Sequence, residues 1–337
     1  MVGCISASAV EPIVTLWTWS PGPDYPTYIL PGRASEGRVD VLSAYIRKMR
    51  ASPSLKTEIP LTKWNGLHFD PAARPKGFLW HQDSRRRVLL LANGLQDHVP
   101  STPRLNMFIP RFQSLGLKSF VLPVGATARF SRQERQAIHK LLGQHFGTIN
   151  PLGGPDIAPE HYGQDVKYAV NFNSERDAYE IELLQDVYNL TKAKITGPCR
   201  AMQIVCVALG CALNQDIQKV LNINEVHSAA DHGIEHPVVL FPTSNGLADA
   251  LFSGLESWFI SYHHQSVSLP PQSIFEIAAV SHQGVIEAVI SRDGRIVLTQ
   301  GHAERPDSAG AGEIFYRRLA MWMKSSSDCN SILGAAI

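Results

Sequence analysis

Apolar residues follow two spacings along this chain. From residue 88 onward, short continuous apolar runs alternate with segments in which apolar side chains recur every three or four residues. The first pattern is typical of buried parallel strands, and the second marks one face of a helix. The sequence therefore predicts strands at 88–92, 120–124, 148–151, 193–197, 237–241, 274–280, 285–290 and 296–299.

The predicted helices carry start signals. Ser131, with Glu134 three residues later, has the form of a capping box, and Ser174 is followed by Asp177 at the same spacing. Helices are predicted at about 105–112, 131–145, 174–188, 199–213, 246–255 and 312–324. Arg292-Asp293-Gly294 is a hairpin turn between the last two strands. The alternation predicts an α/β fold, with a mostly parallel central sheet, helices on both faces and a late antiparallel addition.

Residues 1–86 have a different pattern. Tryptophans 17 and 19 and prolines 21, 23, 26 and 31 indicate an irregular, turn-rich segment whose aromatic rings need a surface to pack on. Val39, Leu42, Ile46 and Met49 predict one amphipathic helix. We therefore expect an N-terminal extension (1–86) packed on a catalytic domain (87–325), followed by a tail (326–337). The extension is a candidate for substrate gating, a homodimer contact or a protein partner.

Composition and charge narrow the class of protein. The 337 residues are 44% hydrophobic, enough for a sizeable core. Because 31 basic residues nearly balance 30 acidic ones, no overall field favours nucleic acid or an anionic membrane. No apolar run reaches the roughly 18 residues of a membrane span, and the first residues lack a signal-peptide pattern. We expect a cytoplasmic protein.

One cysteine stands out among five. Cys199 follows Gly197-Pro198 at the junction of a predicted strand and an apolar helix, where free N–H groups and the helix dipole favour a thiolate. A cysteine here could equally be a small buried apolar side chain, the usual role of a free cysteine. Cys206 and Cys211 are expected in the core. No CxxC pair is present, and His227, His232 and His236 lack a metal-ligand spacing, so neither disulfides nor a metal site are predicted.

Several motifs point to one family. They are Gly153-Gly154-Pro155-Asp156 with Tyr162-Gly163, Arg176-Asp177 with Glu180, Gly197-Pro198-Cys199-Arg200 with Gln203, Tyr262-His263-His264-Gln265, Gly284 to Ala288, and Gln300-Gly301-His302-Ala303-Glu304. In order and spacing they resemble the class I glutamine amidotransferase-like hydrolases, and most closely the gamma-glutamyl-gamma-aminobutyrate hydrolase family, peptidase family C26. The resemblance extends over about two-thirds of the chain.

This resemblance implies a flavodoxin-like fold and a cofactor-free reaction. Hydrolysis of an amide needs a nucleophile, a group that protonates the leaving amine, and donors for the oxyanion. By resemblance, Cys199 is the nucleophile, His302 the base and Glu304 its orienting acid, and N–H groups of Gly153, Gly154 and Arg200 form the oxyanion hole. The expected substrate-binding residues are Asp156, Gln203, Tyr262, His263, His264 and Gln265.

The expected activity is hydrolysis of a gamma-glutamyl amide or isopeptide bond in a small metabolite or conjugate, through a gamma-glutamyl thioester. Two departures from the family pattern, Ala201 for a glycine and Ala303 for a proline, bear on packing and on the His302–Glu304 geometry. A glutaminase unit that supplies ammonia to a separate synthase is one alternative. A catalytically silent binding scaffold, with the extension as its interaction arm, is another.

Overall fold

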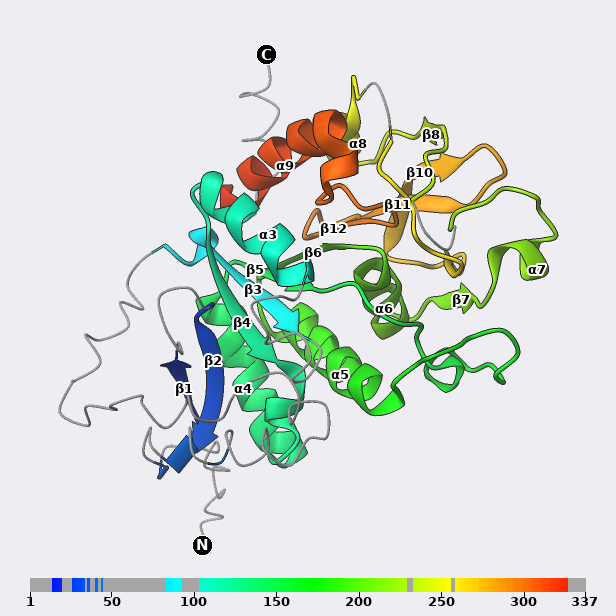
Figure 1. Cartoon of the computed structure of the whole chain (residues 1–337). Helices are drawn as coiled ribbons and strands as arrows, with labels where there is room; N and C mark the ends of the chain where they lie inside the picture. Colours follow the sequence, from blue (N-terminus) through cyan, green and yellow to red (C-terminus); the bar gives the residue numbers. More distant parts are fainter. Residues whose placement is uncertain are drawn as a thin grey trace, which may run out of the picture.

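The computed structural model describes residues 14–19, 26–33, 35–36, 40–41, 44, 83–92, 103–228, 233–255 and 258–326. Ten strands form one sheet in the order β1-β2-β4-β3-β5-β6-β12-β11-β10-β8 (Figure 1). They are β1 (Val14–Trp19), β2 (Tyr28–Arg33), β3 (Arg87–Ala92), β4 (Lys118–Pro123), β5 (Thr148–Pro151), β6 (Lys194–Pro198), β8 (Val238–Leu240), β10 (Phe275–Ser281), β11 (Ile286–Ser291) and β12 (Ile296–Thr299). A separate pair consists of β7 (Ala212–Asn214) and β9 (Ser266–Ser268).

The centre of the sheet is parallel. Neighbours from β2 through β12 run parallel, whereas β1 and the β12-β11-β10-β8 end are antiparallel. Counted along the chain, β4-β3-β5-β6-β12 has the flavodoxin-like order 2-1-3-4-5. The predicted α/β fold and its late antiparallel addition are therefore confirmed.

Helices cover both faces. They are α3 (Pro103–Ser114), α4 (Arg132–His145), α5 (Ser174–Leu190), α6 (Arg200–Ala208), α7 (Ile217–Leu221), α8 (Leu247–Phe252) and α9 (Ala309–Lys324). Buried side chains of α3, α8 and α9 form one core, and those of α4, α5 and α6 form the core on the opposite face. Within the described ranges, no helix combines the length and apolar character needed to cross a membrane.

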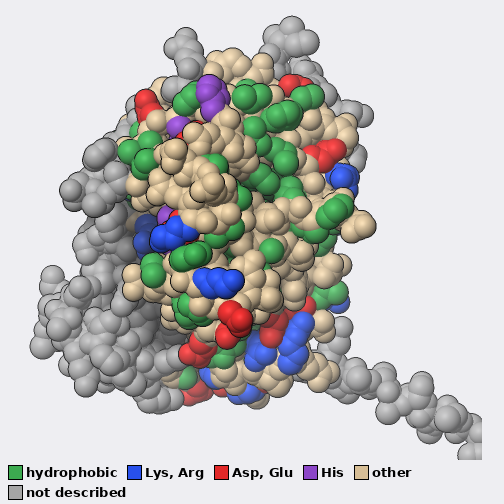
Figure 2. Space-filling view, turned by 90° about the vertical axis from the view of Figure 1, so that its right-hand side faces the viewer, with side chains coloured by type: hydrophobic (Ala, Val, Ile, Leu, Met, Phe, Trp, Pro, Cys, Tyr) green, Lys and Arg blue, Asp and Glu red, His purple; other side chains and the backbone are tan. Residues whose placement is uncertain are grey.

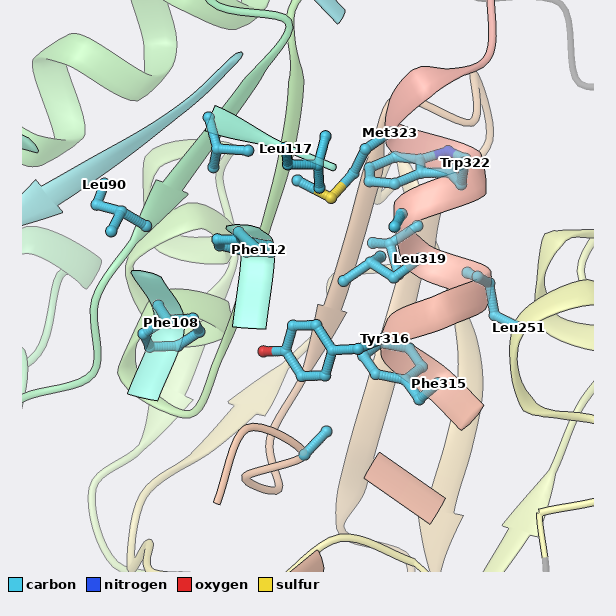
Figure 3. Packing of buried hydrophobic residues seen from close by; sticks show 14 of the residues in the cluster. Leu90, Phe108, Phe112, Leu117, Leu251, Phe315, Tyr316, Leu319, Trp322 and Met323 are labelled. Atoms are coloured by element: carbon cyan, nitrogen blue, oxygen red, sulfur yellow. The ribbon is translucent and has the colours of Figure 1, made fainter. Parts of the chain in front are cut away.

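Aromatic side chains join α3 to α9 on the first face (Figure 3). Phe112 lies between Phe108, at 6.0 Å with the rings stacked, and Tyr316, at 5.9 Å edge to face. Trp322 is 1% exposed, and its indole N–H donates to the Gly294 carbonyl over 3.0 Å. This packing anchors α9 against the sheet, with Trp322 at the turn between β11 and β12.

Helix boundaries follow local signals in most places. Ser131 and Glu134 form the predicted capping box of α4. α5 begins at Ser174 as predicted, but its cap is Asn173, whose side chain accepts the Arg176 N–H over 3.0 Å. The helix after Cys199 is shorter than predicted. α6 ends at Ala208 because Gly210 takes a left-handed φ of 91°, and the apolar residues beyond it enter β7.

The prediction of an irregular N-terminal segment is wrong for two stretches. Residues 14–19 and 28–33 form β1 and β2, which pair antiparallel and extend the sheet beyond β4. Pro31 is tolerated inside β2 because the pairing with β4 is confined to Tyr28, so no ladder bond to β4 needs its missing N–H. Val39, Leu42, Ile46 and Met49, the predicted amphipathic helix positions, lie outside the described residues.

The opposite edge of the sheet is formed by β8. Within the part of the chain that the structure describes, β8 pairs only with β10, and Val239, Leu240 and the following Phe241 are 45%, 40% and 42% exposed. Figure 2 faces this side of the molecule, where charged side chains gather mainly toward the bottom of the view and hydrophobic ones are scattered above. The antiparallel end of the sheet therefore presents apolar side chains to solvent.

Candidate active site

The site lies at the carboxyl ends of three neighbouring parallel strands. Gly153 follows β5, Cys199 follows β6, and His302 follows β12. In an open α/β sheet, ligands bind in the crevice outside these strand ends. The topology therefore brings together residues that are about 50 and 100 positions apart in the sequence.

Cys199 occupies a sharp turn between β6 and α6. It caps α6 with a backbone φ of 56° and ψ of −117°, a conformation rarely adopted by residues other than glycine. Such a conformation persists only where the surrounding structure imposes it, and it is frequent at functional positions. Here the Cys199 N–H donates to the Thr299 carbonyl over 2.8 Å, which ties the turn to the end of β12.

The turn also explains why Ala201 is tolerated at a position where the family has a glycine. A Cβ at Gly197 would lie 2.6 Å from the Cβ of Ala201 and 2.9 Å from the Pro151 carbonyl oxygen. The missing side chain of Gly197 therefore makes room for the methyl group of Ala201. The first turn of α6 can approach β6 closely although the family's glycine is absent.

His302 lies between the Glu304 carboxylate and Cys199 and hydrogen-bonds to both. Its Nδ1 lies 2.6 Å from Oε1 of Glu304. Since a carboxylate only accepts, Nδ1 carries a proton and Nε2 is left to meet the hydrogen bond with Cys199. Burial lowers the pKa of His302, but the charges on Glu304 and Cys199 outweigh burial and raise this pKa to about 10. Both ring nitrogens therefore carry a proton at neutral pH, and the ring is positively charged.

The segment that carries His302 is fixed without the family's proline. Ala303 is 1% exposed, and the His302 N–H donates to the Ile260 carbonyl over 2.8 Å. One Nη of Arg111 donates to the Glu304 carbonyl over 3.3 Å. Packing and hydrogen bonds thus hold the two reactive side chains on one side of the segment.

The three predicted oxyanion-hole residues lie beside this pair. A Cβ on Gly153 would stand 3.9 Å from Cε1 of His302. A Cβ on Gly154 would meet the Arg176 guanidinium at 2.7 Å and the Arg200 side chain at 3.0 Å. Arg200 is the first residue of α6, where backbone N–H groups have no partner within the helix. Gly154 therefore allows a close approach of backbone to the two arginines that a side chain would block, whereas a Cβ at Gly153 would make only an ordinary contact with His302.

Four buried charges lie under the glycine pair. The Arg200 guanidinium donates to Asp177 and to Glu180, each over 2.5 Å, and Arg176 donates to Glu180 over 3.0 Å. Burial lowers the pKa of Arg200, but Glu180 and Asp177 outweigh burial and raise it. Asp177 also accepts the Ala158 N–H over 2.9 Å. The cluster thus links the segment after the glycine pair, the start of α5 and the start of α6. Because the Arg200 guanidinium is bonded within the cluster, only the backbone of Arg200 is available to bind substrate.

The predicted substrate residues fall into two groups. Near the reactive pair, the Tyr262 ring stands edge to face against His302, with centroids 5.7 Å apart. Asp156 and His264 pair with each other, with His264 Nε2 at 2.9 Å from both carboxylate oxygens. This hydrogen bond raises the pKa of His264. Asp156 also accepts the Val170 N–H over 2.8 Å.

The second group points into the interior. Gln203 donates to the Gln265 carbonyl over 3.2 Å and to the Gln300 side chain over 3.4 Å. Gln265 is 1% exposed, and its side chain accepts the Ile157 N–H over 3.4 Å. His263 is buried, with its Nδ1 2.9 Å from the Gln265 carbonyl and its Nε2 3.5 Å from Glu287 Oε1. The structure thus places these three predicted binding residues in the scaffold that supports the site.

Sequence reasoning missed two features. Arg305 lies with its guanidinium 4.1 Å from the Tyr262 ring centroid, and its buried Nε makes no hydrogen bond within the described chain. The rejection of a metal spacing for His227 and His236 overlooked convergence in space, because both meet His263 and Glu287. His232 lies outside the described residues. No regular sequence spacing could have found this cluster, because its members span 60 positions.

The family model for peptidase C26 matches residues 115–304, more than half of the chain. The chain belongs to the peptidase C26 family. The match covers the glycine pair, the Cys199 turn and the His302–Glu304 segment, and it supports a hydrolytic, amidase-type function for this chain.

The curated relatives agree with this family. Protein NtpR of Enterococcus hirae is 29% identical over 47% of this chain and 67% of its own length. A Mycobacterium tuberculosis protein, whose name assigns it provisionally to the glutamine amidotransferases, is 31% identical over 45% of this chain and about half (49%) of its own length. YvdE of Lactococcus lactis, named as glutamine amidotransferase-like, is 26% identical over 58% of this chain and 78% of its own length.

Solved structures are more distant. A glutamine amidotransferase from Thermotoga maritima shares 14% identity over 71% of this chain and 98% of its own, with a TM-score of 0.44. The glutaminase domain of a Trypanosoma brucei CTPS, solved with bound acivicin, shares 15% identity over 71% of this chain and 95% of its own, with a TM-score of 0.47.

Proposed function

We propose that this protein is a cysteine-dependent hydrolase of gamma-glutamyl amides, in a small metabolite or a conjugate. The supporting observation is the arrangement of Cys199, His302 and Glu304, in which a thiol on a strained turn meets an imidazole oriented by a buried carboxylate. Nucleophile, base and orienting acid in this geometry define nucleophilic amide hydrolysis.

The proposed reaction has two halves. The Cys199 sulfur attacks the gamma-carbonyl carbon, and the oxyanion accepts hydrogen bonds from the N–H of Arg200 and one from the Gly153-Gly154 pair. His302 gives its proton to the leaving nitrogen as the C–N bond breaks, which releases the amine and leaves a thioester. Water then attacks the thioester while His302 takes one of its protons. The C–S bond breaks, the acid leaves, and Cys199 is restored as a thiolate beside the protonated His302.

The gamma-glutamyl group supplies one carboxylate and one ammonium for recognition. Arg305, with an unpaired buried Nε beside the ring that faces His302, is the candidate partner for the carboxylate. Asp156 is the candidate partner for the ammonium, in exchange for His264. These assignments predict that amides lacking the carboxylate or the ammonium are hydrolysed with a much lower kcat/KM.

A panel of gamma-glutamyl amides with the purified chain tests the proposal. Amine release is the readout, and intact-protein mass spectrometry detects the thioester as a mass increase that disappears in Cys199→Ala. Glutamine as the preferred substrate, with ammonia release and a co-purifying synthase, would support the glutaminase alternative. No turnover and no thioester with any amide would indicate a binding scaffold.

Arg305→Lys gives a sharper test of recognition. Lysine keeps the charge but loses the planar donor pair, so KM should rise while kcat changes little. Arg317→Lys, on the exposed face of α9 and paired with Glu313 over 2.8 Å, is the matched control. Equal effects of the two substitutions would contradict the role given to Arg305.

A further inference from the structure

Three histidines and one glutamate converge in the interior beside the active site. His227, His236, His263 and Glu287 each offer one donor atom, and these atoms lie within 4.8 Å of one another. The four residues are 3%, 7%, 3% and 0% exposed. We propose that this cluster, the histidine–glutamate cluster, binds one zinc ion.

The distances from Glu287 to the three imidazoles fit a small tetrahedral ion. Glu287 Oε1 lies 3.2 Å from Nδ1 of His227, 3.6 Å from Nε2 of His236 and 3.5 Å from Nε2 of His263. Zinc bonds of about 2.0–2.1 Å in a tetrahedron place donor atoms roughly 3.3 Å apart. The observed distances scatter around this value. Three imidazoles with one carboxylate are also a donor set that zinc accepts.

The hydrogen bonds around the cluster leave donor lone pairs directed inward. His263 Nδ1 lies 2.9 Å from the Gln265 carbonyl, which can only accept, so Nδ1 carries the proton and a neutral ring presents a bare Nε2. His227 turns its Nε2 toward Glu225 Oε2, at 3.3 Å, and its Nδ1 toward Glu287. His227 and His263 thus each have an outer partner and an inner nitrogen that faces Glu287, whereas the outer Nδ1 of His236 is buried and makes no hydrogen bond within the described chain.

His236 also differs at its inner nitrogen. Its Nε2 lies 2.8 Å from the Ser261 hydroxyl, and either group can be the donor, depending on the tautomer of the ring. Ion binding requires the hydroxyl to rotate away, a change confined to one side-chain torsion. His236 is therefore the ligand whose hydrogen bond the ion replaces.

The buried carboxylate needs a cation. Neither Glu287 oxygen, nor the inner nitrogens of His227 and His263, makes a hydrogen bond within the described chain. An uncompensated carboxylate in the interior is strongly unfavourable. Protonated imidazoles would approach it at about 2.7–3.2 Å in good hydrogen bonds, whereas the nitrogens stand at or beyond the long end of that range. The gap suits an ion placed between the groups.

A second cluster in the molecule shows the contrast. Asp186 accepts from His139 and from both terminal nitrogens of Arg132, over 2.7 to 2.8 Å, and Glu182 is bonded to Arg135. There, arginines already neutralise the carboxylates through direct hydrogen bonds. The histidine–glutamate cluster contains no such cation.

The site is closed, and its place in the fold suggests a structural role. Four protein ligands and full burial leave no open position for substrate, as in structural zinc sites. The ion would join the segment before β8, the chain around His263 and β11. Tyr262, next to His263, packs on His302, and the Glu287 carbonyl accepts the Gln300 N–H over 2.7 Å. Zinc would therefore fix the positions of Tyr262 and Gln300, which support His302.

Metal analysis and zinc-edge X-ray absorption of the full chain, purified with zinc supplied, test the proposal. We expect about one zinc per chain with four nitrogen or oxygen ligands at about 2.0–2.1 Å and no sulfur. The absence of sulfur separates this site from zinc held by Cys199, for which a bond near 2.3 Å is expected. Chelation should lower Tm, and added zinc should restore it.

Two variants and a matched control complete the test. Glu287→Gln and His263→Ala should each lower zinc content at least tenfold. His264→Ala, one position along the chain and bonded to Asp156 instead, should keep its zinc. A wild-type chain that binds no zinc, a sulfur ligand in the spectrum, or zinc retained by Glu287→Gln would each overturn the proposal. The wild-type measurements decide the question even if a variant fails to fold.

Discussion

At the residue scale, Cys199 and Cys206 lie seven positions apart and are both buried, but their backbone conformations differ. Cys206 is fully buried within α6, whereas Cys199 stands on the turn at its start. We predict that Cys199→Ala folds and loses all turnover. Cys206→Ala should keep turnover but lower the free energy of unfolding by about 1–2 kcal/mol through a small cavity. Labelling with a thiol-reactive glutamine analogue, located by mass spectrometry, and chemical denaturation measure the two effects. Full activity in Cys199→Ala would end the thiol mechanism.

The raised pKa of His302 has a consequence for the pH profile. A group held near pKa 10 keeps its proton through neutral pH and loses it only at alkaline pH. Turnover that depends on this proton should therefore persist through pH 7–8 and fall as pH rises toward 10. In Glu304→Gln the negative charge is gone, so the pKa of His302 should drop and the alkaline fall should move to lower pH.

The same substitution should lower turnover at least about tenfold, roughly 1.4 kcal/mol of barrier. Ala303→Pro is the control and should change turnover less. If Glu304→Gln leaves both turnover and the pH profile unchanged while His302→Ala is inactive, the orienting acid is another residue.

At the scale of elements, Glu134 joins β2 to α4. It completes the capping box with Ser131 and accepts from Arg33, with Oε1 at 2.5 Å. The Arg33 hydrogen bond is the main reason that the pKa of Glu134 is lowered to about 2. A lowered pKa means stability that is present above about pH 4.5 and lost as pH falls toward 2.

We therefore predict that Glu134→Gln is less stable than the wild type at pH 7 and that the difference shrinks between pH 4.5 and 2. Because the Arg33 side chain is 41% exposed, screening should keep the effect to about 1 kcal/mol or less. Urea denaturation at several pH values measures it, with Gln133→Glu as a control for added charge. A difference that does not vary with pH would contradict this assignment.

The elements differ in how well sequence predicted them. Strands such as 88–92 were found because continuous burial leaves a continuous apolar run, and α4 was found because its cap is local. β1 and β2 were missed because prolines dominate that segment and its pairing is distant. The end of α6 was missed because Leu209 and Leu213 keep helical spacing beyond the turn.

The candidate site shows a similar division. Family motifs located the Cys199 turn and the His302–Glu304 segment, since short stretches carry them. The inward direction of Gln203 and Gln265, and the meeting of His227 with Glu287, depend on tertiary packing that no local pattern encodes.

At the scale of the whole molecule, the N-terminal strands lie at the far edge of the sheet from the antiparallel end. β1 pairs with β2, β2 pairs with β4, and the three strands β4, β3 and β5 separate β2 from β6. We predict that deletion of residues 1–33 lowers Tm and promotes aggregation, because it uncovers the edge of β4. Labelling of Cys199 should persist in the folded fraction. Thermal scans and labelling of the soluble fraction test this.

Loss of labelling in a folded truncated chain would show that the N-terminal part reaches the site. The proposed contact of residues 1–86 with a second copy or a protein partner remains a prediction. Light scattering of the full chain and of the truncated chain addresses it.

The parallel pairing of β6 with β12 joins Ile195 to Ile296, about a hundred residues along the chain. Contacts between such distant segments form slowly in folding, because a long loop must close before any bond is gained. The hydrogen bond from Cys199 to Thr299 belongs to this pairing. The Cys199 turn can gain this hydrogen bond only after β12 has paired with β6. We therefore expect the Cys199 turn, and the reactivity that depends on it, to be completed late in folding.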